Sequence, residues 1–172
     1  TEEFIQITTR IREVSEFKQK LNKLEIGTII EAKGPQGTFV LNSSHLVPSA
    51  SLVFLAGGIG ITPFRSMIKY NIDRKLNSPM FLIYSNSDDD FVFKKDLDIW
   101  QKENNFIKVT YFDSSVSGHL NKASLNHFIS DHSISSVFYA VGPPAFVNTM
   151  EDILEELKVP TDQIKTEKFT GY

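Results

Sequence analysis

The spacing of hydrophobic positions changes near residue 50 of this 172-residue chain. Before that point residues 4–12 alternate, with isoleucines at positions 5, 7 and 11 on one face, which is the period of a β-strand. Apolar runs at residues 28–33 and 38–41 flank a Gly-Pro-Gln-Gly turn and predict two more strands. A helical stripe begins at Ser15. This part of the chain predicts a piece of an antiparallel sheet, followed by a polar linker over residues 42–51.

After residue 51, short apolar strands alternate with helix-length amphipathic segments. The clearest helix covers residues 146–157, where Phe, Met, Ile and Leu recur at helical spacing. Such alternation implies right-handed crossovers and a parallel sheet that is covered on both faces. We therefore expect an α/β fold with a five-stranded, parallel, doubly wound sheet. Its strands are expected at residues 52–56, 80–85, 108–112, 136–141 and 164–169.

Composition excludes several classes of function. The net charge of −3 offers no basic excess for nucleic acid, and the apolar runs are too short to cross a bilayer. The chain has no cysteine, which rules out disulfides, thiolate nucleophiles and an iron–sulfur cluster held within these residues. The four histidines show no metal-ligand spacing, and no Gly-x-Ser-x-Gly elbow is present. We expect a soluble, cytoplasmic protein with no nucleic-acid site, no metal site and no membrane segment in this chain.

A glycine-rich turn follows the first strand of the expected parallel sheet. Residues 54–64 read FLAGGIGITPF, so a buried strand runs into glycines and then into a helix that begins near Thr62 and Pro63. Proline suits the first helical position, and the threonine can cap free amides. Glycines let the backbone approach a ligand, and a helix N-terminus favours an anion such as pyrophosphate. The alternative is a tight strand–helix turn without a ligand, because short glycine motifs are common.

A second turn follows the fourth expected strand of the parallel sheet. Residues 138–147 read FYAVGPPAFV, in which Gly142 permits close backbone approach and two prolines stiffen the start of the clearest helix. Alone, this pattern could be an ordinary helix start. Together with the first turn, about eighty residues earlier, it forms a combination that ordinary helix starts do not show.

The two turns together resemble the nucleotide domain of the ferredoxin–NADP reductase superfamily, which includes flavohaemoglobin reductases, oxygenase reductases and cytochrome b5 reductase. The resemblance extends to the closing EKFTGY and to residues 12–41, which look like the later part of the family's flavin barrel. It therefore covers nearly the whole chain. It implies that residues 1–50 are the C-terminal part of a truncated FAD-binding β-barrel, and that residues 51–172 are an NAD(P)-binding domain.

The resemblance also implies roles for individual residues. The glycines of the first turn would lie against the nucleotide pyrophosphate, and residues of both turns would border the nicotinamide. Tyr172 would cover a flavin face, unless it is a frayed terminus. The implied catalytic residues are Thr62, Val141, Glu167 and Phe169. The implied cofactor-binding residues are Gly57, Gly58, Gly60, Thr62, Pro63, Asp113, Gly142, Pro143, Thr9, Arg10, Ser15 and Tyr172.

The chain departs from the family pattern in two ways. Many relatives have Cys where Val141 stands, so the residue beside the nicotinamide differs. The family's Arg-x-Tyr-Ser/Thr flavin motif is missing, so flavin contacts would have to come from Thr9, Arg10 and Ser15. We therefore expect a truncated barrel that binds FAD weakly. Its exposed first strand would favour pairing with a second copy of the chain as a dimer.

The resemblance implies an enzyme, an NAD(P)H-dependent flavin reductase. Hydride would pass from NADH or NADPH to FAD, and electrons would then pass to a separate acceptor such as a ferredoxin, a haem or an oxygenase component. NADH is favoured because Asp113 follows the third strand, where a carboxylate would bind a ribose hydroxyl and repel a 2′-phosphate. The alternative is that Asp113 is an ordinary turn residue. The alternative functions are a non-catalytic NAD(P)H-binding regulatory module and a subunit that needs a flavin-bearing partner.

Overall fold

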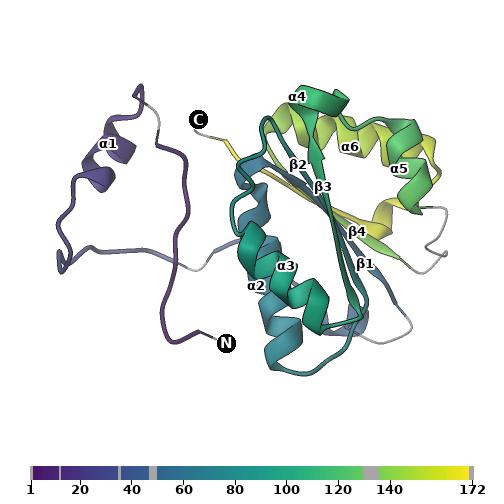
Figure 1. The fold of residues 1–172 in the computed structure, drawn as a ribbon, viewed down its shortest axis with the longest axis horizontal. Coiled ribbons are helices and arrows are strands. Elements are labelled where there is room, and N and C mark those ends of the chain that lie inside the picture. Colours follow the sequence, from purple (N-terminus) through teal and green to yellow (C-terminus); the bar gives the residue numbers. More distant parts are fainter. Residues whose placement is uncertain (1, 12, 35, 47–49, 130–135, 171–172) are drawn as a thin grey trace.

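A five-stranded parallel sheet with the strand order β3-β2-β1-β4-β5 forms the centre of the protein (Figure 1). This confirms the α/β fold predicted from the sequence. The computed structural model describes residues 2–11, 13–34, 36–46, 50–129 and 136–170. The strands are β1 (Leu52–Gly57), β2 (Met80–Asn86), β3 (Ile107–Asp113), β4 (Val137–Gly142) and β5 (Ile164–Lys168).

The direction in which the chain winds across the sheet reverses between β1 and β4. β1 lies at the centre of the sheet and pairs with β2 on one side and with β4 on the other. Because all these strands are parallel, the carboxyl ends of β1, β2 and β4 meet at one edge. In open α/β sheets, this switch point is where ligands bind.

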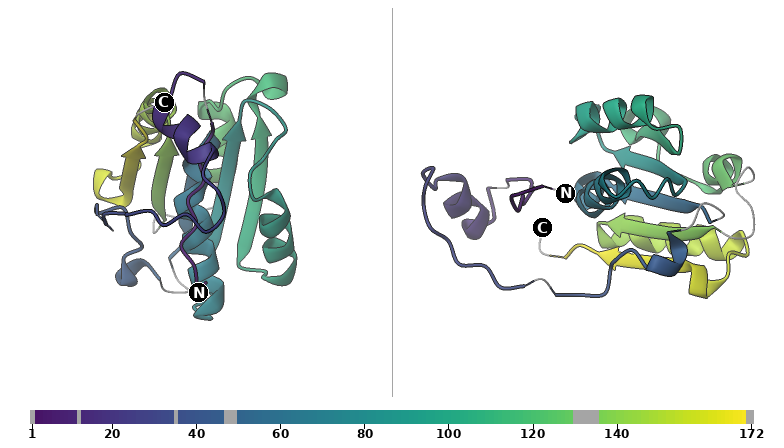
Figure 2. Two further views of the ribbon diagram at one scale, coloured as in Figure 1. Left: turned by 90° about the vertical axis from the view of Figure 1, so that its left-hand side faces the viewer. Right: turned by 90° about the horizontal axis from the view of Figure 1, so that it is seen from below.

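Helices cover both faces of the sheet (Figure 1, Figure 2). The helices that follow β1 are α2 (Ile61–Asp73), α3 (Lys94–Glu103), α4 (Ser114–Ser117), α5 (Lys122–Ile129) and α6 (Pro144–Glu156), whereas α1 (Glu16–Asn22) precedes the sheet and lies apart from it. Side chains alternate along each strand, so Phe54 and Leu82 pack with α2 and α3, while Val53 and Ile83 pack with α5 and α6. All of β1 is buried, which explains its continuous apolar sequence. In the part of the chain that the structure describes, no helix is both long and apolar enough to span a membrane.

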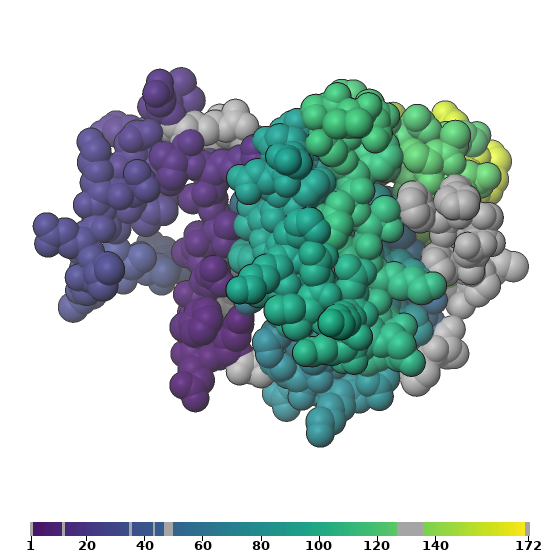
Figure 3. Space-filling model, in the orientation of Figure 1, coloured from purple at the N-terminus to yellow at the C-terminus, as the bar shows by residue number. Residues whose placement is uncertain are grey.

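The residues before the sheet form an extended arm, which we define as residues 2–46. Its described residues include α1 and the short 3-10 helix η1 (Ser43–His45) but no strand, so the predicted partial barrel is not seen among them. A strand needs a hydrogen-bonded neighbour, and the segments predicted as strands have none among the described residues. Ile5 and Ile29 are consequently 95% and 96% exposed. Figure 3 shows the arm as a lobe beside the rest of the molecule, residues 50–170, which we call the sheet domain.

Polar and aromatic contacts attach the arm to the sheet domain. The carboxylate of Glu2 accepts hydrogen bonds of 3.0 and 2.9 Å from the two terminal nitrogens of Arg65 in α2. Nη2 of Arg10 donates to Oδ1 of Asn86 at the end of β2, at 2.8 Å. Phe39 packs against the hydrophobic core on the α2 face. The arm is thus held mainly by side chains rather than by a backbone ladder.

Candidate functional site

The two predicted turns lie side by side because β1 and β4 are neighbours in the sheet. β1 ends at Gly57, and the 3-10 helix η2 (Gly58–Gly60) leads into α2. β4 ends at Gly142, and α6 begins at Pro144, directly after Pro143. A Cβ on Gly142 would lie 3.0 Å from both the Cα and the carbonyl oxygen of Gly57. The absence of a side chain therefore lets the two strand ends come into backbone contact.

Two glycines of the first turn are required by packing within the protein. A Cβ on Gly57 would come within 2.7 Å of the Phe146 ring in α6. A Cβ on Gly60 would come within 2.2 Å of the carbonyl oxygen of Val141, a fully buried residue of β4. The tight-turn alternative from the sequence therefore accounts for Gly57 and Gly60 without a ligand.

Gly58 has a different environment. Its φ is +54°, which glycine adopts readily, and a Cβ built there would have only Asn86 Oδ1 nearby, at 3.8 Å. Gly58 lines a pocket of about 200 Å³ at the carboxyl ends of β1, β2 and β4, which we call the switch-point pocket. Its lining consists of Arg10, Gly57, Gly58, Ile59, Ser85, Asn86, Ser87, Ser114, His119, Pro143 and Phe146.

The switch-point pocket has the electrostatic character of an anion site. Its lining includes the guanidinium of Arg10 and no carboxylate. The neighbouring helix α2 begins at Ile61 with Gly60 as its N-cap, and no side chain caps its first amides. The positive end of this helix therefore adds to the charge of Arg10. Arg10, which the resemblance assigned to flavin binding, lines this pocket together with Gly57 and Gly58.

Thr62 does not cap α2, so that part of the sequence prediction is wrong. The helix begins two residues before Pro63, the expected first helical position, and the Thr62 hydroxyl donates to the carbonyl oxygen of Ile59 at 3.1 Å. This bond closes the η2 turn onto the first turn of α2. The threonine thus stabilises the turn from within rather than supplying an acceptor for free amides.

Asn86 connects several loops around the switch-point pocket and is 4% exposed. Its Nδ2 donates to Asp88 Oδ1 at 2.6 Å and to the carbonyl oxygen of Asp90 at 3.0 Å. Its Oδ1 accepts the bond from Arg10, and its backbone oxygen accepts a bond of 3.0 Å from the Ser114 hydroxyl. Sequence reasoning missed this residue because a single asparagine after a strand forms no motif. Its place at the carboxyl end of a central strand was the available signal.

A second pocket, of about 380 Å³, lies between the arm and the ends of β4 and β5, and we call it the arm pocket. It brings together Thr9 and Phe169, which lie near opposite ends of the sequence. The amide of Phe169 donates to the carbonyl oxygen of Gly142 at 2.9 Å, which holds this residue beside the second turn. Ile59 lines both pockets. The arm pocket is lined by Thr8, Thr9, Lys18, Ile59, Lys168, Phe169 and Thr170.

Lys168 of the arm pocket is held by an ion pair with α6. Its Nζ lies 2.9 Å from Oε2 of Glu151, whose Oε1 accepts a bond of 2.7 Å from the Thr166 hydroxyl. Burial acts to raise the pKa of Glu151, but the bonds from Lys168 and Thr166 outweigh it and hold that pKa below its ordinary value. The carboxylate is therefore ionised, and it fixes the end of β5 against α6.

The structure separates other predicted residues from these two pockets. Asp113 caps α4: its Oδ1 accepts bonds from the Ser115 hydroxyl and amide, at 2.6 and 2.8 Å, and these lower its pKa. Ser15 caps α1 by accepting a bond of 3.4 Å from the amide of Lys18. Glu167 lines a separate pocket of about 360 Å³ at the edge of β5. Tyr172 lies outside the described residues.

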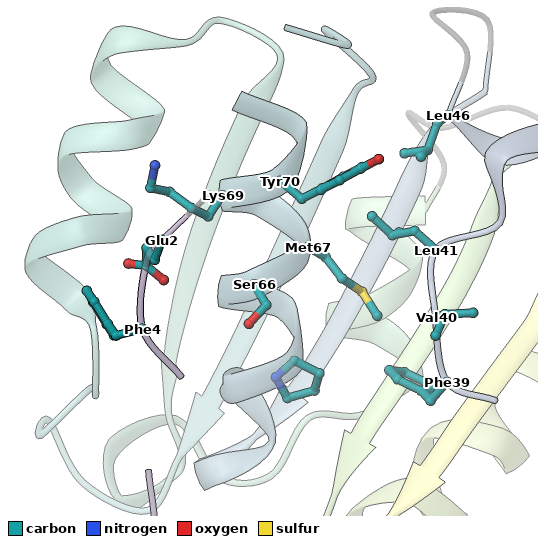
Figure 4. A pocket seen from close by; sticks show the side chains of 11 residues that line it. Glu2, Phe4, Phe39, Val40, Leu41, Leu46, Ser66, Met67, Lys69 and Tyr70 are labelled. Atoms are coloured by element: carbon teal, nitrogen blue, oxygen red, sulfur yellow. The ribbon is translucent and has the colours of Figure 1, made fainter. Parts of the chain in front are cut away.

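Pro63 lines a further pocket, of about 570 Å³, between the arm and α2. Figure 4 shows Met67 of α2 facing Phe39 and Leu41, with Glu2 on the other side of the helix. The lining is largely apolar and contains no glycine of either turn. This pocket is therefore distinct from the switch-point pocket and from the arm pocket.

The sequence of this chain matches a known protein family. Residues 54–152 match the family model of the oxidoreductase NAD-binding domain. The chain is 28% identical over 165 residues to nitrate reductase [NADH] of Cucurbita maxima, across 84% of this chain and 18% of that protein. The chain therefore spans less than a fifth of the length of this relative.

Solved structures share the fold. Flavohemoglobin from Malassezia yamatoensis with bound FAD and heme superposes with a TM-score of 0.82 at 21% identity, covering 94% of this chain and 43% of that chain. The CS-b5R domains of human Ncb5or in the NAD+ form give a TM-score of 0.79 at 21% identity, covering 92% of this chain and 47% of that chain. At these identities the likeness concerns the fold alone.

Proposed function

The chain belongs to the oxidoreductase NAD-binding domain family, within the ferredoxin–NADP reductase superfamily, and on this premise we propose that it binds the nicotinamide dinucleotide of a flavin-dependent reductase. In the proposed reaction a hydride passes from NADH to FAD, and electrons then pass to a separate acceptor. The observation that carries the proposal is the switch-point pocket, where Gly58 and Arg10 line one space beside the start of α2, which no side chain caps.

The proposal assigns the dinucleotide pyrophosphate to the switch-point pocket. Gly58 has no side chain to keep a phosphate away from its backbone, and its positive φ is unstrained. Arg10 supplies charge-assisted hydrogen bonds, and the N-terminus of α2 adds a favourable dipole. These groups bind and orient the dinucleotide. Since none of the lining residues is acidic, the phosphate meets no like charge within the pocket.

The proposal assigns the nicotinamide end, and the flavin next to it, to the side of the arm pocket. The hydroxyls of Thr8 and Thr9 and the ammonium group of Lys18 suit a flavin phosphate, so the residues fit the cofactor, while the ammonium group of Lys168 is paired with Glu151. Flavin, when bound, supplies the conversion of a two-electron donor into one-electron steps. The ring of Phe169, fixed by its backbone bond to Gly142, excludes water there.

We propose NADH rather than NADPH as the donor. The name of the Cucurbita maxima relative specifies NADH. Around the ends of β2 and β3 stand the carboxylates of Asp88, Asp90 and Asp113, which would repel a 2′-phosphate. Because the Asp113 carboxylate already accepts two bonds from Ser115, we assign it an effect through charge rather than a direct bond to the ribose.

The test combines a binding and a spectroscopic measurement. NADH and NADPH are titrated into the chain by calorimetry, and the chain is then mixed with FAD and followed by anaerobic visible spectroscopy as NADH is added. Tighter binding of NADH and bleaching of bound flavin support the proposal. Nucleotide binding without any bound flavin would support the regulatory module or the subunit that needs a flavin-bearing partner. If neither NADH nor NADPH binds, the proposed binding of a nicotinamide dinucleotide is contradicted.

We also propose a role for residues 1–50, a class of electron acceptor and a cellular location. We assign residues 1–50 to the later part of an FAD-binding barrel, the acceptor to a ferredoxin, a haem or an oxygenase component, and the protein to the cytoplasm. The exposed residues 4–11 would pair with a second copy. Analytical ultracentrifugation should then show a dimer whose fraction rises with concentration, and a monomer at every concentration would contradict this pairing.

A further inference from the structure

We propose that Asn86 is a positioning residue that holds the guanidinium of Arg10 at the switch-point pocket, so that phosphate binding depends on this attachment of the arm. The inference rests on the proposed function, because it takes the ligand to be a dinucleotide phosphate. It extends that function by giving a role to a buried amide outside both glycine turns.

The partners of Asn86 determine which way its amide points. Its Nδ2 donates to the Asp88 carboxylate at 2.6 Å and to the backbone carbonyl of Asp90 at 3.0 Å. With its donor side occupied, the amide presents Oδ1 to Nη2 of Arg10 at 2.8 Å. The flipped amide would place an NH2 group against a guanidinium, two donors without an acceptor. The loop after β2 therefore sets the direction in which Arg10 is held.

Asparagine is a suitable partner because it carries no charge. A guanidinium has five N–H donors, and its bond to Asn86 Oδ1 leaves its positive charge unneutralised. That acceptor oxygen lies 3.8 Å from where a Cβ of Gly58 would stand. Arg10 is thus fixed within the same small space as the exposed glycine backbone, where a phosphate would contact both.

Arg65 provides the contrast within the same chain. It also attaches the arm, but its Nη2 lies 2.9 Å from a carboxylate oxygen of Glu2 and 3.2 Å from one of Asp96. Two carboxylates neutralise its charge, and Glu2 lines the apolar pocket over α2 rather than the switch-point pocket. Removing the Glu2 contact therefore loosens the arm without changing the charge at the phosphate site.

The test is calorimetric titration of NADH into the full 172-residue chain and its variants. We expect Arg10→Gln to weaken binding about tenfold and Asn86→Ala about fivefold. The double variant should bind no more weakly than Arg10→Gln alone, because Asn86 acts through Arg10. Glu2→Gln, the matched control for arm attachment, should change affinity less than about twofold.

The dependence of affinity on salt separates positioning from a general structural effect. Screening of the Arg10 charge makes NADH binding weaker at high salt, and both Arg10→Gln and Asn86→Ala should flatten this dependence. Asn86→Ser keeps an acceptor for Arg10 and should recover part of the affinity. It also serves as the second variant if Asn86→Ala does not fold, as judged by its melting temperature.

Three outcomes would overturn the inference. The first is that Asn86→Ala weakens binding as much in the Arg10→Gln background as in the wild type. The second is that Glu2→Gln matches Asn86→Ala. The third is wild-type affinity in all Asn86 variants while the wild type binds NADH, in which case only this inference fails. If the wild type binds neither NADH nor NADPH, the proposed function fails together with it.

Discussion

The arm and the sheet domain contain similar apolar residues, yet they use them differently. β1 of the sheet domain buries all of its side chains between two helical layers. In the arm, Ile26 and Ile29 are fully exposed. The sheet domain is stabilised by burial, whereas the arm is attached by Arg65, Arg10 and Phe39. The comparison shows that apolar character stabilises a segment only where another element covers it.

Truncation of one leucine in each region should give the largest difference in the free energy of unfolding between the sheet domain and the arm. Leu154 in α6 is fully buried, so Leu154→Ala should lower the free energy of unfolding by about 2–5 kcal/mol through lost burial and a cavity. Leu24 of the arm is 45% exposed and lies outside the sheet domain, and Leu24→Ala should change the free energy of unfolding by less than about 0.5 kcal/mol. Urea denaturation measures both. Equal losses would mean that the arm folds as part of the same core.

Glycine substitutions in the sheet domain and in the arm should give the next largest difference in the free energy of unfolding. In Gly60→Ala the new Cβ would lie 2.2 Å from the Val141 carbonyl oxygen, so backbone must move, at a cost of about 1–3 kcal/mol in the free energy of unfolding. Gly27 of the arm has no atom within 4 Å of a Cβ, so strain from Gly27→Ala stays within the arm. Urea denaturation of the sheet domain should therefore detect only the first change. A wild-type midpoint for Gly60→Ala would show that the turn is not tightly packed.

Limited proteolysis should separate the two regions without a mutation. Trypsin should cut first after arm lysines such as Lys18, Lys23 and Lys33, because that backbone carries no sheet ladder and few buried contacts. The sheet domain should resist for longer, and mass spectrometry of early fragments identifies the sites. If the first cuts fell within β1 or α2, the sheet domain rather than the arm would be the less stable region.

Lowering the pH should give the smallest of these effects, a weakening of the Glu2–Arg65 contact that attaches the arm to the sheet domain. The hydrogen bond from Arg65 holds the pKa of Glu2 below its ordinary value of 4.5. A lowered carboxyl pKa means that this contact is complete above pH 4.5 and is lost as the pH falls through the folded-state pKa. Trp100 reports the change, because the Arg65 guanidinium lies 5.5 Å from its ring centroid. Fluorescence should shift slightly below pH 4.5, and Glu2→Gln should abolish the shift.

The sheet was predictable from sequence because its signals are local. Apolar runs such as residues 52–56 form strands that helices cover, and the glycine turns mark where strands end. The strand predicted at residues 4–12 is not formed over its described residues 4–11, because alternation describes one side of a pairing, while the pairing partner decides whether a strand forms.

The site was only partly predictable. Gly58 and Pro143 lie in the switch-point pocket, as the two turns suggested. Asn86 and His119 gave no motif, because their place depends on how β2 and the loop after α4 meet beyond the sheet. Arg10 was assigned to flavin because its neighbours in sequence resemble a flavin strand, but its location depends on a contact 76 residues away.

The position of Ile59 has a consequence for the size of the ligand. Ile59 lines both the switch-point pocket and the arm pocket, so a molecule that fills both must pass this residue. A mononucleotide in either space would end at this isoleucine. A dinucleotide has a second ring system on the far side of its phosphates and reaches across. The chain would therefore select ligands by their length, because only a ligand long enough to pass Ile59 contacts both pockets.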